Sequence, residues 1–98
     1  MDKTAALSKL KPHEDALRGL GVEQLSLFGS TARDEANANS DVDLSATFAS
    51  DAKVGFFKFA VIAERLESIL GVSVDLVGEP ARKARIQSEI DRDRVRVF

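Results

Sequence analysis

The sequence of 98 residues contains no cysteine, no tyrosine and no tryptophan, and it has only one histidine. The lack of cysteine excludes disulfide bonds and thiolate metal sites. No apolar run approaches the roughly 18 residues that a membrane-spanning helix needs. The opening sequence MDKTAALSKLK has no long apolar segment and does not indicate a signal peptide. We therefore expect a cytoplasmic protein with no membrane contact.

Several common ligand-binding motifs are also missing. The sequence has neither a Walker A motif nor a GxGxxG motif. An EF-hand beginning at Asp41 is excluded because Ala46 stands where glycine is required and Ala52 where glutamate is required. The single histidine, His13, lies beside Pro12 in a polar stretch, so we expect it on the solvated surface.

Length and charge restrict the interpretation further. The chain is long enough for a single domain, residues 1–98, with a modest core. Its net charge of −2 argues against a general nucleic-acid-binding protein. Basic side chains nevertheless gather near the C-terminus, and we expect them to form a solvated face or to contact nucleotide phosphates or an acidic partner: Arg82, Lys83, Arg85, Arg92, Arg94 and Arg96.

The longest predicted helix spans about 52–70. Ser50 or Asp51 is expected to cap its start, and Gly71 is expected to end it. Its apolar residues recur at helical spacing, which predicts packing against a sheet. Its phenylalanines could instead stack on adenine or form a partner surface. The stripe comprises Phe59, Ile62, Ala63, Leu66, Ile69 and Leu70, widened by Val54, Phe56, Phe57 and Val61.

Two further helices are expected, over 4–20 and 81–91. Pro12 interrupts the pattern of the first stretch. We expect it in the first turn of a helix that runs to about Leu20, because proline fits the start of a helix. The residues from Arg94 to Val97 alternate in polarity, which predicts a short edge strand. Together with the strand patterns described below, these elements predict an α/β fold.

The segment 41–48 alternates between polar and apolar residues without a break. A period of two is typical of a strand, and it places Asp41 and Asp43 on one face. Their Cα atoms are then about 7 Å apart, from a rise of roughly 3.3 Å per residue. Two neighbouring carboxylates repel each other unless one is protonated or a cation lies between them. A hard divalent ion with oxygen ligands, above all Mg²⁺, suits this pair.

A glycine turn precedes this strand. Leu25–Phe28 reads as a short strand, and Gly29 permits a tight turn with close backbone approach. The sequence STARDEA then predicts a helix that Ser30 or Thr31 could cap, and Thr31 with Asp34 fits a capping box. A helix start after a glycine turn presents free N–H groups that suit phosphate. Arg33, in the first turn, could add a charged donor.

Gly29-Ser30, a gap of ten residues, and Asp41-x-Asp43 together resemble the signature of the DNA polymerase β-type nucleotidyltransferase superfamily. The short chain is similar to its minimal branch, the MNT proteins. The resemblance implies a palm fold, a small mixed β-sheet of three to four strands with helices packed on it. It also implies a third carboxylate on a later strand, which Asp75 supplies within 72–77.

The resemblance implies a role for each of these residues. Gly29, Ser30 and Arg33 would hold the phosphates of a nucleoside triphosphate, ATP. Asp41 and Asp43 would bind two Mg²⁺ ions. Asp75 would complete the second metal site and help to deprotonate the acceptor hydroxyl.

The resemblance also implies a partner. MNT proteins are antitoxins of HEPN-domain ribonuclease toxins, and such an antitoxin would transfer AMP from ATP to a tyrosine of the toxin. Because this chain has no tyrosine, that modification would have to occur on another protein. Two alternatives remain open. The chain could be an aminoglycoside-type nucleotidyltransferase, acting as an oligomer, or an antitoxin that neutralises by binding alone.

Overall fold

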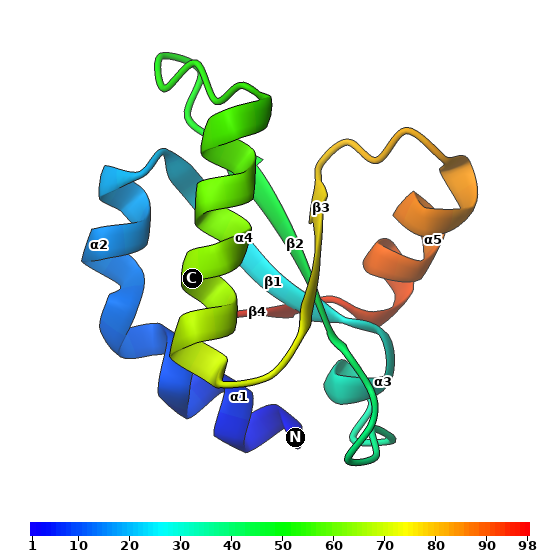
Figure 1. The fold of residues 1–98 in the computed structure, drawn as a ribbon. Helices are drawn as coiled ribbons and strands as arrows, with labels where there is room; N and C mark the ends of the chain where they lie inside the picture. The colour runs from blue at the N-terminus through cyan, green and yellow to red at the C-terminus, as the bar shows by residue number, and fades with distance from the viewer.

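The computed structural model describes residues 1–98 and shows a four-stranded mixed sheet (Figure 1). The strands follow the order β3-β2-β1-β4 across the sheet. β1 pairs antiparallel with β2 and with β4, whereas β2 and β3 are parallel. This confirms the predicted small mixed sheet. The strands are β1 (Val22–Phe28), β2 (Val42–Phe48), β3 (Val74–Gly78) and β4 (Val95–Arg96).

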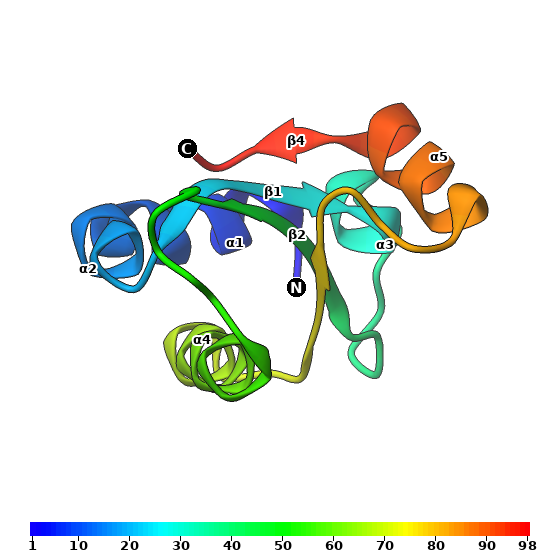
Figure 2. The ribbon, with the colours of Figure 1, turned by 90° about the horizontal axis from the view of Figure 1, so that it is seen from above.

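Helices cover both faces of the sheet. Seen from above, α4 lies on one side of the strands and α5 on the other (Figure 2). Buried residues of α1 and α2 belong to the same apolar cluster as those of α4, so these three helices cover one face. The helices are α1 (Lys3–Leu10), α2 (Glu14–Gly19), α3 (Gly29–Ala32), α4 (Phe56–Leu70) and α5 (Ala84–Asp93), with a 3₁₀ turn, η1 (Lys11–His13), between α1 and α2.

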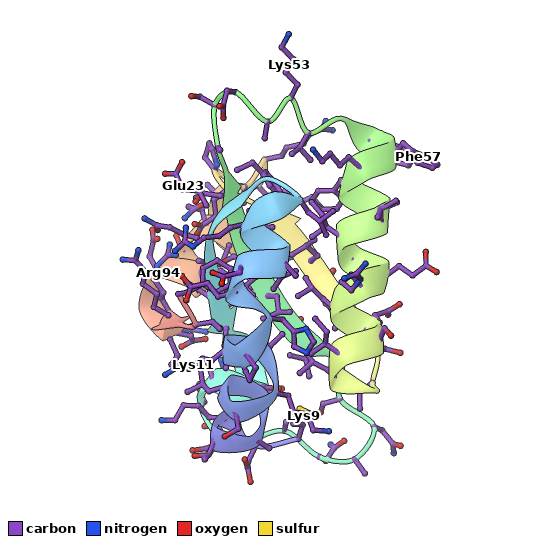
Figure 3. All side chains as sticks on the ribbon, turned by 90° about the vertical axis from the view of Figure 1, so that its left-hand side faces the viewer. Lys9, Lys11, Glu23, Lys53, Phe57 and Arg94 are labelled. Atoms are coloured by element: carbon purple, nitrogen blue, oxygen red, sulfur yellow. The ribbon has the colours of Figure 1, made fainter.

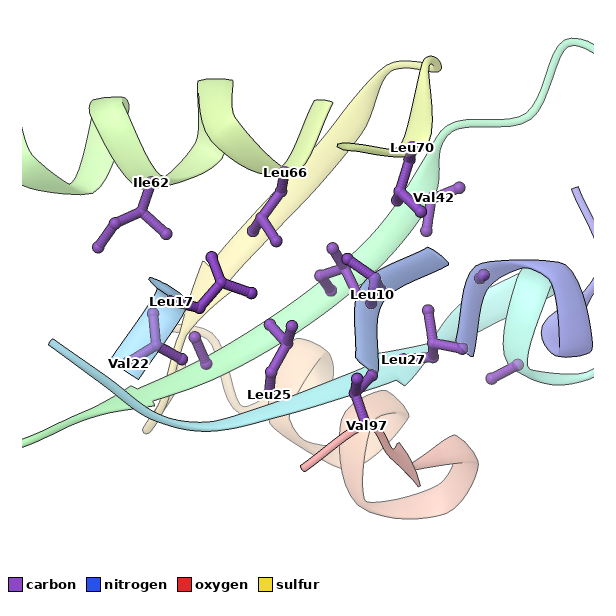
Figure 4. Packing of buried hydrophobic residues seen from close by; sticks show 14 residues of the cluster. Leu10, Leu17, Val22, Leu25, Leu27, Val42, Ile62, Leu66, Leu70 and Val97 are labelled. Carbon is purple, nitrogen blue, oxygen red and sulfur yellow. The ribbon is translucent and has the colours of Figure 1, made fainter. Parts of the chain in front are cut away.

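The apolar core forms between α4 and the sheet because β2 alternates as its sequence predicts. Val42 and Leu44 are buried on the core side, and Asp43 is consequently directed to the opposite face. Figure 4 shows the side chains that meet in this core. They include Leu10, Leu17, Leu25, Leu27, Ile62, Leu66 and Leu70, each no more than 1% exposed.

The start of α4 differs from the prediction. The helix begins at Phe56, with Gly55 in an extended conformation as its N-cap and no side-chain cap, so the predicted capping by Ser50 or Asp51 is wrong. A turn precedes it, since the Ala52 N–H donates to the carbonyl of Ala49. The predicted end is confirmed, because Gly71 adopts the left-handed conformation that closes a helix.

The phenylalanines at this end of α4 also depart from the prediction of core packing. Phe56 is 91% exposed and Phe57 is 82% exposed. Figure 3 shows Phe57 projecting away from the rest of the molecule. Phe59, by contrast, is half-buried and meets Phe48 edge to face, with ring centroids 6.1 Å apart. The apolar stripe is therefore divided between core and surface within the first turn of the helix.

The other predicted helices and strands agree more closely with the structure. Pro12 lies in the first turn of η1, where the first helical stretch changes direction. The predicted C-terminal edge strand is confirmed as β4. The last helix is shifted by a few residues, from 81–91 to Ala84–Asp93, because Lys83 is extended and serves as its N-cap. No helix has the length and apolar character needed to cross a membrane.

Candidate active site

The parallel pairing of β2 with β3 places Asp43 directly beside Asp75. Paired residues in a parallel ladder share a face, so the two carboxylates lie next to each other on the side opposite to the core. Asp41 lies just before β2 and is exposed, whereas Asp43 is half-buried. The structure thus brings two of the predicted carboxylates together and leaves the third at the rim.

The electrostatics of Asp43 reflect this crowding. Burial, followed by the charges of Asp75 and Asp41, raises the pKa of Asp43 to about 6. Glu89 of α5 adds to the shift, and Arg33 opposes it. Glu89 is a fourth acidic side chain near the site that the sequence did not reveal, because no local pattern tells how α5 lies against the sheet.

Gly29 leaves the space that the Asp43 carboxylate occupies. Its φ of +71° is in the left-handed region that favours glycine. A Cβ atom at this position would overlap Oδ2 of Asp43 and lie 3.1 Å from its Cγ. The predicted tight turn with close approach is therefore confirmed, and the group that approaches is the central carboxylate.

The helix after this turn is shorter than predicted. α3 has four residues and begins at Gly29 directly after β1, so its N-cap position is Phe28, which cannot cap. The predicted capping box is wrong, because Thr31 lies inside the turn with its hydroxyl buried and without a partner. Asp34 instead accepts a hydrogen bond from the backbone N–H of Lys3 at 2.9 Å. The loop is thereby tied to the start of α1.

Arg33 follows this single turn as its C-cap rather than lying in the first turn of a helix. Its Nε donates to Glu35 at 3.2 Å, and its Nη1 donates to Asp93. The Asp93 side chain is only 5% exposed and also pairs with Arg92. These contacts hold the guanidinium between the glycine turn and α5, close enough to Asp43 to influence its pKa.

Three of the six C-terminal basic residues, Arg85, Arg92 and Arg94, are engaged in ion pairs. Arg94 pairs with Glu79 at 2.6 Å, and Arg85 lies 3.9 Å from Glu89. Arg82 and Lys83 form no ion pair and are exposed. The cluster is therefore partly a network of surface ion pairs and partly unpaired positive charge at the start of α5.

The donor set fits a hard divalent cation. Asp41, Asp43 and Asp75 offer only oxygen. Burial, and then the charges of Asp75 and Asp41, raise the pKa of Asp43, and a bound cation would stabilise its ionised form. No three acidic or histidine side chains lie close enough together, as they stand, to hold a metal ion. Asp41 and Asp75 are exposed, so their side chains have room to turn toward Asp43.

Known proteins are similar to this chain in sequence and in fold. Residues 10–97 match the family described as the nucleotidyltransferase domain. The protein adenylyltransferase MntA of Thermococcus cleftensis is 37% identical over 91 residues, which is 92% of this chain and 90% of the relative. A solved structure described as a minimal nucleotidyltransferase superposes with a TM-score of 0.71 at 30% identity, over 97% of this chain and 95% of that one.

A more distant likeness concerns the fold alone. The complex of a tri-AMPylated HEPN toxin with its MNT antitoxin, from Shewanella oneidensis, contains a chain that superposes with a TM-score of 0.67. The two sequences are 18% identical, and the match covers 94% of this chain and 71% of that one.

Proposed function

The chain belongs to the nucleotidyltransferase domain family and is an enzyme of that kind; on this premise we propose that it transfers AMP from ATP to a tyrosine of a partner HEPN-domain toxin. It would thereby act as the antitoxin of that toxin. The single observation that carries the proposal is the pairing of Asp43 with Asp75 beside the Gly29 turn.

Two relatives support the choice of acceptor. The relative from Thermococcus cleftensis is named a protein adenylyltransferase. In the Shewanella oneidensis complex, AMP groups are carried by the HEPN toxin that an MNT antitoxin binds. The absence of tyrosine from this chain agrees with transfer to another protein, because the chain offers no phenol of its own.

The residues of the glycine turn have the first task, which is to hold the triphosphate. The backbone N–H groups of Gly29 and Ser30 and the Ser30 hydroxyl would donate to phosphate oxygens. Arg33 would add charge at the same side, because its guanidinium is held there by Asp93. This arrangement would position the α-phosphorus in front of Asp43.

The carboxylates have the second task. Asp41, Asp43 and Asp75 would hold Mg²⁺, which when bound neutralises phosphate charge and makes the acceptor hydroxyl more acidic. Asp75 takes the proton from the tyrosyl oxygen. That oxygen bonds to the α-phosphorus while the bond from phosphorus to the bridging oxygen breaks, and pyrophosphate leaves with the electron pair. The products are the AMP–tyrosine ester and pyrophosphate.

The test is label transfer from ATP labelled at the α-phosphate, with Mg²⁺, to the purified HEPN-domain toxin. We expect label on the partner with the natural chain and none with Asp41→Asn. Asp51→Asn is the matched control, because Asp51 is an exposed acid in the loop before α4 and should leave transfer unchanged.

Other outcomes would redirect the assignment. A complex that forms without label on the partner would contradict adenylyl transfer and leave neutralisation by contact. Label on an aminoglycoside, with none on the partner, would instead indicate a small-molecule nucleotidyltransferase.

A further inference from the structure

A groove of about 670 Å³ opens beside Asp75, outside the glycine turn that would hold the nucleotide. It lies between the start of α4, the edge strand β3 and the segment that leads into α5. Its lining includes apolar side chains of both helices, among them Phe56 and Phe59 of α4 and Ile86 of α5. Asp75 is part of the same lining.

The rim of this groove carries positive charge without a partner. Arg82 and Lys83 line the groove, and neither is paired with an acid of this chain, whereas Arg94 is paired with Glu79. Unpaired cations beside an exposed aromatic residue are suited to a ligand that brings both acidic and apolar groups. Phe56, 91% exposed, is the aromatic residue.

The groove also contains free backbone groups. At the two ends of the β2–β3 ladder, the Ser73 carbonyl accepts from Val42 and the Glu79 N–H donates to Ala46. In a parallel strand, the backbone N–H and C=O groups of every second residue point toward the partner strand. Those of Leu76 and Gly78 therefore point away from β2. Because β3 is an edge strand, these outward N–H and C=O groups are available to an extended peptide.

The in-line geometry of the proposed reaction indicates which molecule the groove binds. The sheet order places β1, which carries the Gly29 turn, and β3, which carries the groove, on opposite sides of β2. Phosphoryl-group displacement needs the attacking oxygen and the leaving group roughly in line. With pyrophosphate leaving on the β1 side, the acceptor oxygen has to arrive from the β3 side, where Asp75 faces the groove.

We propose that this groove binds an acidic segment of the acceptor protein, anchored by an apolar side chain, and thereby presents its hydroxyl to Asp75. The inference rests on the proposed adenylyl transfer. It assigns Phe56, Arg82 and Lys83 to recognition of the acceptor, with no part in binding the nucleotide.

The experiment is a charge swap between protein and peptide. One fluorescent peptide carries a tyrosine flanked by leucine and two glutamates, and a second carries lysines in place of the glutamates. Binding is followed by fluorescence anisotropy, and transfer is followed with ATP labelled at the α-phosphate. The protein variants are Arg82→Glu/Lys83→Glu and Phe56→Ser. Lys11→Glu/Arg65→Glu is the matched control, because it changes the net charge equally at exposed positions outside the groove lining.

We expect the natural chain to bind and label the glutamate peptide at least about tenfold better than the lysine peptide. Arg82→Glu/Lys83→Glu should reverse this preference, Phe56→Ser should weaken binding of the glutamate peptide, and the control variant should behave as the natural chain does. Binding of a fluorescent ATP analogue should be the same in every variant.

Three results would overturn the inference. The first is equal binding of both peptides by all variants. The second is a loss of binding of the ATP analogue by Phe56→Ser or Arg82→Glu/Lys83→Glu, which would make the groove a nucleotide site. The third is a dimer of the natural chain that Phe56→Ser dissociates, which would make a second copy the occupant. A charge swap in binding without label on any acceptor would refute the proposed function and leave the docking of an acidic segment standing.

Discussion

Replacing Gly29 with alanine provides a sharp test of the site, because two costs of the change can be worked out separately. An alanine at a φ of +71° costs about 1–2 kcal/mol in backbone strain. Its Cβ would also overlap Oδ2 of Asp43, so the carboxylate has to rotate away, at roughly 0.5–1.5 kcal/mol if it leaves its preferred rotamer. The first cost reduces stability alone, whereas the second displaces the carboxylate that we propose as the central metal ligand.

Gly71 provides the matched control. Its φ of +72° imposes the same strain, but nothing lies within 4 Å of an added Cβ. We expect Gly71→Ala to lower the free energy of unfolding by about 1–2 kcal/mol, roughly 4–8 °C in Tm for each kcal/mol, and to retain its response to Mg²⁺. Gly29→Ala should lose at least as much stability and should also lose that response.

The assay is the rise in Tm on adding Mg²⁺, together with label transfer to the partner. At a Mg²⁺ concentration ten times Kd, binding to the folded chain alone contributes about 1.4 kcal/mol. In an Asp43→Ala background only the Cβ of residue 43 stays near the added Cβ, at 3.3 Å, so Gly29→Ala should cost less than in the natural chain and approach the cost of Gly71→Ala. A Gly29→Ala variant that keeps both its Mg²⁺ response and its transfer activity would refute the reasoning.

Four further outcomes follow from the same structure. Without divalent ions, Asp43→Asn should raise Tm above pH 6, with the gain fading as pH falls to 4, because a pKa raised to about 6 makes ionisation unfavourable in the folded chain. Asp93→Asn should lower Tm at pH 7, with the loss fading as pH falls from 4 toward 2, because Arg92 and Arg33 lower the pKa of Asp93 to about 2. Asp75→Asn should abolish label transfer without lowering Tm in EDTA. Leu66→Ala, at a fully buried position, should cost about 2–5 kcal/mol, measured by urea unfolding.

The local part of the site could be predicted from the sequence. Alternation in 41–48 fixed which face carries Asp43, and the glycine turn was recognisable because few other residues allow such a close approach. The strand at Asp75 was also recognisable, although only the resemblance singled it out. Its register with Asp43 is a property of the sheet, and no sequence pattern contains it.

The non-local part could not be predicted. Burial of Asp93 and the approach of Glu89 depend on how α5 lies against the sheet, which helical periodicity does not determine. Phe56 and Phe57 satisfied an apolar pattern and still project into solvent, because α4 starts later than its composition suggested. Periodicity shows which face of a helix is apolar, but not how far the core extends along that helix. Phe56 and Phe57 lie in the first turn of α4, beyond the edge of the core.

The parallel ladder of β2 with β3 makes the chemistry dependent on completed folding. Asp43 and Asp75 become neighbours only after the whole α4 crossover has closed, and contacts so distant along the chain form late and slowly. An unfinished or partly unfolded chain therefore carries the two carboxylates apart from each other. The proposed catalysis is in this way a readout of conformational integrity, because its paired carboxylates exist as a pair only in the completed fold.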